Sequence, residues 1–171
     1  NRGDLRCETI FDVVKPSVAV YVPGYNEPSE FHRRLSMLSK CSMREYVREV
    51  WRIHELRKAA VFKALRENRD WRLFMAWFDL ADLIGHVYIK KNRLKVLRAY
   101  LELNALAGKL QRLVPADTVF LVLSDHGMQP VEDDDAGHHT GHAFWSLNID
   151  TDWEPHDFTD FYPKILEWVG E

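Results

Sequence analysis

Two mainly apolar stretches, each followed closely by an aspartate and a histidine, limit what this chain can fold into more than any other feature. One spans residues 72–78 and leads to Asp82 and His86; the other spans 118–123 and leads to Asp125 and His126. Short runs rich in β-branched and aromatic residues predict buried strands. Open α/β sheets gather functional residues where such strands end. We therefore expect both Asp–His pairs at one sheet edge, where they would form a metal site.

The rest of the chain alternates predicted strands and helices. Residues 17–22 predict a strand, and a short helix is expected after Pro28. Ser42 and Glu45 form a capping-box pattern that predicts a helix to about residue 67. Further expectations are a helix over 91–113, a polar loop over 129–142, a strand over 143–148 and a helix over about 158–169. This order predicts an α/β fold with a mostly parallel sheet sandwiched by helices. The helix over 91–113 is expected to bury one stripe: Val96, Tyr100, Leu103, Ala107, Leu110 and Leu113.

Composition places the chain among ordinary globular proteins. Its 171 residues are 46% hydrophobic and 29% charged, enough for one domain over residues 1–171 with a sizeable core. A net charge of −3 gives no excess of positive charge that would favour binding to nucleic acid or to an anionic membrane. No apolar run approaches the roughly 18 residues of a membrane span. Cys7 and Cys41 are too few for a disulfide framework, so free thiols and a cytoplasmic location are expected.

The two Asp–His pairs suggest metal ligation for different reasons. Asp82 and His86 are four residues apart, so on a helix they share a face and can reach one cation. Carboxylate and imidazole together suit Zn²⁺ or Mn²⁺ better than Ca²⁺, although this spacing also fits an ordinary surface pair. Asp125 and His126 follow a strand directly, where unsatisfied polar groups are costly, and Gly127 permits a tight turn. A turn-capping Asp beside a satisfied histidine is the alternative there.

Residues 137–142, with the sequence GHHTGH, add a third cluster. It holds three imidazoles, His138, His139 and His142, in a segment bordered by glycine. The acidic run at 132–135 is interpreted as a solvated loop rather than as a set of ligands. With three such clusters expected at one sheet edge, a metal site becomes the favoured interpretation.

Together the clusters resemble the metal-binding motifs of the alkaline phosphatase superfamily. The closest resemblance is to its type I phosphodiesterase/nucleotide pyrophosphatase branch. It rests on DLIGH at 82–86, SDHGM at 124–128, and His139-Thr140 followed by FWS at 144–146. The order and spacing of these motifs agree over about residues 8–148, and residues 9–12 and 22–24 are similar to the stretch after the family's nucleophile region.

The resemblance implies hydrolysis of a small phosphate ester or nucleotide by a Thr or Ser nucleophile and two divalent metal ions. Zinc is the expected metal, with manganese as the alternative. Asp82, His86 and His139 would hold one ion, and His138 or His142 could replace His139. The remaining pair, at positions 125 and 126, would hold the other ion with an upstream Asp and the nucleophile. The oligomeric state is left open.

The resemblance also implies a strand and a hydroxyl nucleophile before Asp12, and residues 1–11 are too few to supply them. The nucleophile and its strand are expected upstream of Asn1, so the chain is interpreted as the C-terminal part of a catalytic domain that is inactive alone. A cofactor-independent phosphoglycerate mutase-like phosphotransferase and a sulfatase are related alternatives, so phosphodiesters, phosphomonoesters and sulfate esters stay open. Outside enzymes, the alternative is a non-catalytic metal-binding α/β domain.

Overall fold

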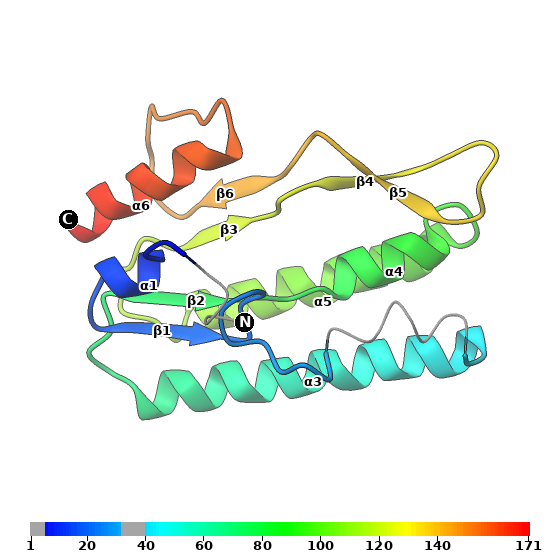
Figure 1. Ribbon diagram of the computed structural model, residues 1–171, viewed down its shortest axis with the longest axis horizontal. Coiled ribbons are helices and arrows are strands. Elements are labelled where there is room, and N and C mark those ends of the chain that lie inside the picture. The colour runs from blue at the N-terminus through cyan, green and yellow to red at the C-terminus, as the bar shows by residue number, and fades with distance from the viewer. Residues whose placement is uncertain (1–5, 32–39) are drawn as a thin grey trace. The chain divides into compact units, whose positions relative to one another are not determined.

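The computed structural model describes residues 6–31 and 40–171 and divides the chain into two compact units (Figure 1). Unit 1 comprises Asn1–Phe78 and Thr159–Glu171, and unit 2 comprises Asp79–Phe158. Each unit has its own strands and helices. The expectation of a single domain over 1–171 stays a prediction.

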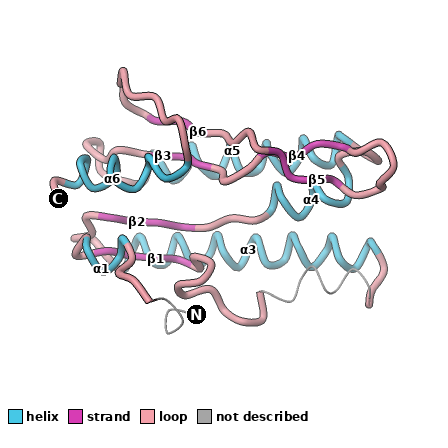
Figure 2. Tube along the Cα trace, turned by 45° about the horizontal axis from the view of Figure 1, so that its top comes forward, coloured by secondary structure: helices cyan, strands magenta, loops and turns pink. Residues whose placement is uncertain are grey.

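Unit 1 is built on a pair of parallel strands. β1 (Ser17–Val20) pairs with β2 (Leu73–Ala76) from Ser17↔Leu73 to Val20↔Ala76. The long helix α3 (Met43–Glu67) connects the two strands and lies along β1 (Figure 2). The unit is completed by α1 (Ile10–Val13), α6 (Phe161–Val169) and most of the 3-10 turn η2 (Phe158–Asp160). A strand–helix–strand crossover between parallel strands is what the sequence predicts for this part.

The predicted capping box begins α3. The Ser42 hydroxyl accepts the Glu45 N–H at 3.3 Å, and the Glu45 carboxylate accepts the Ser42 N–H at 2.9 Å. These hydrogen bonds to Ser42, through its hydroxyl and its backbone N–H, hold the pKa of Glu45 below its usual value. The predicted start at Ser42 and end near residue 67 are confirmed.

A buried arginine lies on the inner face of α3. Arg57 is fully buried and forms an ion pair with Glu27, whose side chain is 10% exposed. Its guanidinium also donates to the carbonyl of Tyr21 at 3.1 Å and to that of Trp77 at 3.4 Å. Tyr21 follows β1 and Trp77 follows β2, so Arg57 joins the carboxyl ends of both strands to α3.

Unit 2 consists of a helix pair and a two-stranded ribbon. α4 (Leu80–Tyr88) packs against α5 (Arg93–Gln111). The ribbon has two ladders: β3 (Leu121–Leu123) is antiparallel to β6 (Trp145–Leu147), and β4 (Gly127–Pro130) is antiparallel to β5 (Gly137–Thr140). Figures 1 and 2 show the chain passing from β3 through β4, turning, and returning through β5 to β6. β4 and β5 both pack on α4.

The α/β class is confirmed, but the mostly parallel sheet is wrong. Two of the three ladders in the described residues are antiparallel. The cause is the segment 129–142, for which the sequence predicts a polar loop. Much of it forms the β4–β5 hairpin, so the chain reverses direction and brings β6 back against β3. The short helix expected after Pro28 falls largely on residues outside the described range.

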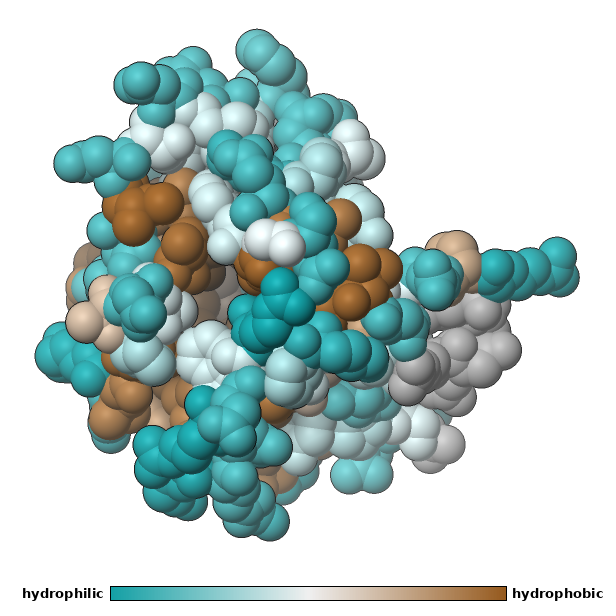
Figure 3. Space-filling view, turned by 90° about the vertical axis from the view of Figure 1, so that its left-hand side faces the viewer, coloured by the Kyte–Doolittle hydropathy of each residue, from teal (hydrophilic) through white to brown (hydrophobic). Residues whose placement is uncertain are grey.

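The predicted buried stripe of α5 is also partly wrong. Val96 is buried as expected, but Ala99 and Leu106 are the other buried positions, whereas Tyr100 is 51% exposed. On the face drawn in Figure 3, hydrophobic residues lie in several separate groups among hydrophilic ones. Among the described helices, none combines the length and apolar character needed to cross a membrane.

Candidate metal centre

α4 carries two of the predicted ligands on one side. The buried residues of the helix form its inner stripe: Leu80, Leu83, Ile84, Gly85 and Val87. Asp82 and His86 are one turn apart, and their side chains are 30% and 22% exposed. Asp82 Oδ1 lies 3.2 Å from His86 Nε2, so the two side chains reach the same point.

β5 brings a third predicted ligand to these two. His139 Nε2 lies 3.1 Å from Asp82 Oδ1 and 3.0 Å from His86 Nε2. His138 precedes it on the strand, where neighbouring side chains point to opposite faces, and its Nε2 pairs instead with Asp134 Oδ2 at 2.7 Å. Of the two adjacent histidines on β5, His139 therefore lies beside Asp82 and His86, whereas His138 pairs with Asp134.

The three atoms form a triangle of a size that suits one metal ion. The distances between Asp82 Oδ1, His86 Nε2 and His139 Nε2 are 3.0, 3.1 and 3.2 Å. In a tetrahedral zinc site with bonds of about 2.0–2.1 Å, two ligand atoms are about 3.3–3.4 Å apart. The donors therefore need only a small expansion to hold a zinc ion.

Backbone carbonyls contact Nδ1 of two histidine rings, which leaves Nε2 as the nitrogen directed toward the candidate centre. His86 Nδ1 lies 2.7 Å from the Gly137 carbonyl oxygen, and His126 Nδ1 lies 2.9 Å from that of Gly127. Because a carbonyl only accepts, Nδ1 is the donor in both rings, and Nε2 is the ring nitrogen nearer Asp82. A hydrogen bond from Nδ1 to a backbone carbonyl is typical of histidines that bind a metal through Nε2.

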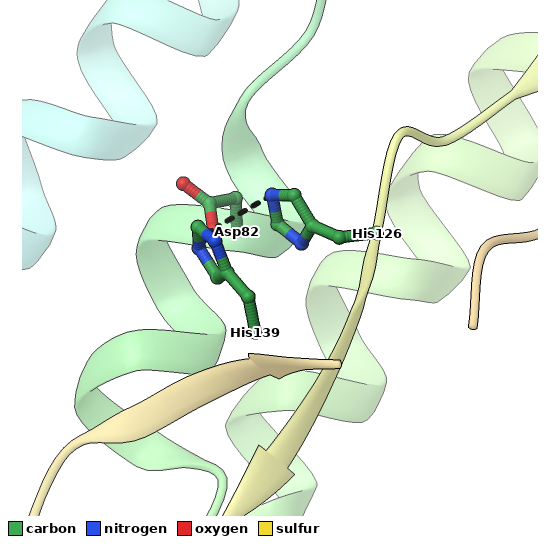
Figure 4. Close-up of side chains that lie close together, drawn as sticks. All are labelled: Asp82, His126 and His139. Atoms are coloured by element: carbon green, nitrogen blue, oxygen red, sulfur yellow. Dashed lines mark hydrogen bonds and ion pairs between the residues drawn. The ribbon is translucent and has the colours of Figure 1, made fainter. Parts of the chain in front are cut away.

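The second predicted pair, Asp125 and His126, lies beside this triangle. His126 Nε2 is 3.9 Å from Asp82 Oδ1 and 3.6 Å from Asp125 Oδ1. The His126 ring stacks on that of His139, with centroids 3.5 Å apart. The ligand atoms of Asp82, His126 and His139 all lie within 4.8 Å of one another, and Figure 4 shows these side chains converging. All five predicted side chains thus gather in one part of unit 2.

Glycines allow the hairpin to approach α4 this closely. A Cβ on Gly137 would lie 2.7 Å from the Gly85 carbonyl oxygen and 2.8 Å from Met128 Sδ. A Cβ on Gly85 would meet Met128 Cγ at 3.0 Å. Since Gly137 also provides the carbonyl behind His86, β5 lies close against α4 at the predicted ligands.

The sequence does not predict the contacts around the predicted ligands. It marks Gly137 only as a border of the histidine cluster, and it predicts only that the acidic run at 132–135 is solvated. In the structure, Lys91 Nζ lies 2.9 Å from Asp135 Oδ2 and lowers the pKa of that carboxyl. The pKa of Asp134 is lowered by the Ala136 N–H and by His138. The sequence signal for these contacts is the pair Lys90 and Lys91, followed by the acidic run at 132–135.

Comparison with family models decides the identity of the chain. The model described as type I phosphodiesterase / nucleotide pyrophosphatase matches residues 6–166. The chain belongs to this family. Family membership indicates hydrolysis of phosphate esters, with small phosphate-ester or nucleotide substrates and a typical dependence on metal ions. Comparison with curated proteins and with solved structures gives no match.

Proposed function

We propose that the chain forms the metal centre of a phosphodiester hydrolase. The observation that carries this proposal is the triangle of donor atoms from Asp82, His86 and His139, with His126 beside it. One carboxylate and two imidazoles form the donor set of a catalytic zinc site that keeps a position open for substrate. Family membership supports phosphate esters as the substrate class.

Each residue has a distinct task in this proposal. Asp82, His86 and His139 hold one divalent ion, zinc in our proposal, while Asp125 and His126 contribute to a second. Such ions, when bound, stabilise negative charge on phosphate oxygens. The carbonyls of Gly137 and Gly127 keep the His86 and His126 rings oriented with Nε2 toward the centre. The half-exposed Asp125 carboxylate lies on the side open to solvent, where a substrate can approach.

Two hydroxyls near the centre are unsuited to act as its nucleophile. Ser124 Oγ accepts the Phe144 N–H at 2.8 Å, and Thr140 Oγ1 donates to the His142 carbonyl at 3.3 Å. Both are engaged in holding the ribbon together. The nucleophile is therefore proposed, as the resemblance implies, to be a Thr or Ser upstream of Asn1.

The test is turnover of an aryl phosphodiester with zinc or manganese supplied. We expect the 171 residues alone to react barely above background, because a nucleophile and its metal act as a unit and losing one removes most of the rate. A longer chain that supplies the upstream hydroxyl should be active, and Asp125→Ala within it should abolish turnover, whereas Ser124→Ala should not.

Three aryl esters given to the longer chain separate the candidate activities. A phosphodiester should react fastest, ahead of a phosphomonoester and a sulfate ester with the same leaving group. Preference for the sulfate ester would identify a sulfatase instead. Absence of turnover with every ester, in a longer chain that binds zinc, would identify a non-catalytic metal-binding domain and overturn the proposal.

A further inference from the structure

Lys90 holds the turn of the β4–β5 hairpin through the backbone. Its ammonium donates to the carbonyl oxygens of Val131, Glu132 and Asp134 at 3.1, 2.6 and 3.0 Å. An ammonium has three protons, so these three acceptors use its full donor capacity. Hydrogen bonds from a charged donor are about twice as strong as neutral ones. Three carbonyls directed at one nitrogen therefore attach this turn to the residues that follow α4.

The turn needs such an attachment because it is long. Six residues, 131–136, join β4 to β5, and the ladder between the two strands has only four residue pairs. Two-residue turns fix the register of a hairpin by their own geometry, whereas longer loops leave more freedom. A shift of one residue would exchange His138 for His139 on the face toward α4.

Lys90 joins the two elements that carry the triangle of ligands. It lies just beyond α4, which carries Asp82 and His86, and it holds the turn that leads into β5 and His139. We propose that Lys90 is a positioning residue for the His139 ligand. This proposal rests on the proposed metal centre and assigns Lys90 the task of keeping His139 Nε2 within reach of Asp82.

The same geometry gives the acidic run at 132–135 a role. Lys90 takes the carbonyls of two of its residues, and Lys91 Nζ pairs with Asp135 Oδ2. The run thus supplies backbone acceptors to Lys90 and a counter-charge to Lys91. Lys91 offers a matched control for Lys90: it is adjacent and equally charged, but its partner is an exposed side chain, a contact of little energetic weight.

The experiment measures zinc affinity by titration calorimetry for the wild type, Lys90→Met, Lys91→Met and His139→Ala. Thermal melts followed by circular dichroism show that each variant is folded at the temperature used. We expect Lys90→Met to bind zinc about tenfold more weakly, in the range found when a residue that supports a ligand is removed. Lys91→Met should stay within about twofold, since it leaves the carbonyls held.

Equal affinities for Lys90→Met and Lys91→Met, with His139→Ala impaired, would overturn the role of Lys90 and leave the metal centre intact. A wild type that binds no zinc would overturn the metal centre and this proposal together.

If Lys90→Met fails to fold, Lys90→Arg replaces it. Its planar guanidinium cannot present three convergent protons on one nitrogen, so weaker binding than in Lys91→Met is expected. Equal binding there would contradict the proposal.

Discussion

Gly137 lies where the hairpin packs tightly against α4. An added methyl group would meet the Gly85 carbonyl, Met128 and Ile89, all within 2.9 Å. Gly137→Ala should therefore destabilise the protein by about 1–3 kcal/mol, as overpacked sites do. Urea denaturation followed by circular dichroism measures the change. Zinc affinity should fall as well, because the Gly137 carbonyl supports His86.

Gly141, four residues further on, provides the control. A Cβ there would meet nothing within 4 Å. Gly141→Ala should leave stability within about 0.5 kcal/mol of the wild type, as surface changes usually do. If both alanine variants unfold at the same urea concentration as the wild type, the close packing of the hairpin on α4 is not a determinant of the site.

At the residue scale, ligand types could be predicted from sequence better than ligand geometry. Asp82 and His86 were identified from their helical spacing, and they share a face of α4 as expected. The selection of His139 over His138 depends on the side of β5 that faces α4. That side is set by the register of a hairpin whose strands, GMQP and GHHT, lack the apolar alternation that marks a strand.

At the element scale, the Arg57–Glu27 ion pair ties α3 to the strand ends. Glu27→Gln would remove the negative charge of Glu27 from beside the fully buried guanidinium. Breaking a buried pair in this way costs about 3–5 kcal/mol. The midpoint of urea unfolding should fall accordingly, with helix content and strand content unchanged before the transition.

Glu67→Gln is the matched change at an exposed pair of the same helix. Glu67 lies 3.9 Å from Lys63, and both side chains are at least 60% exposed. Its removal should change stability by less than about 1 kcal/mol. Equal effects of Glu27→Gln and Glu67→Gln would show that the buried pair does not hold the strand ends.

Most elements were predictable because local signals specify them. The capping box of Ser42 and Glu45 begins α3, and apolar runs mark β1, β2 and β3. The buried Arg57 and the exposed Tyr100 were not predictable, because each depends on what packs against its helix face. The β4–β5 hairpin was missed because glycine contacts and backbone attachments hold it, rather than a hydrophobic pattern.

At the scale of the whole molecule, the candidate centre belongs entirely to unit 2. α4 and the ribbon from β3 to β6 supply all five proposed ligands, while unit 1 contributes the parallel strand pair and α3. The sequence motifs that carry the family resemblance at positions 82–86 and 124–146 fall within unit 2. Family membership over residues 6–166 nevertheless includes both units.

The central claim is that Asp82, His86 and His139 form a metal centre, and zinc binding by two neighbouring variants tests it most directly. His139→Ala removes a proposed ligand, whereas His138→Ala changes the adjacent histidine, which pairs with Asp134. We expect His139→Ala to lose more affinity than the roughly 10- to 100-fold that a supporting residue accounts for. His138→Ala should retain zinc binding. Equal zinc affinity in the wild type and His139→Ala would contradict the account.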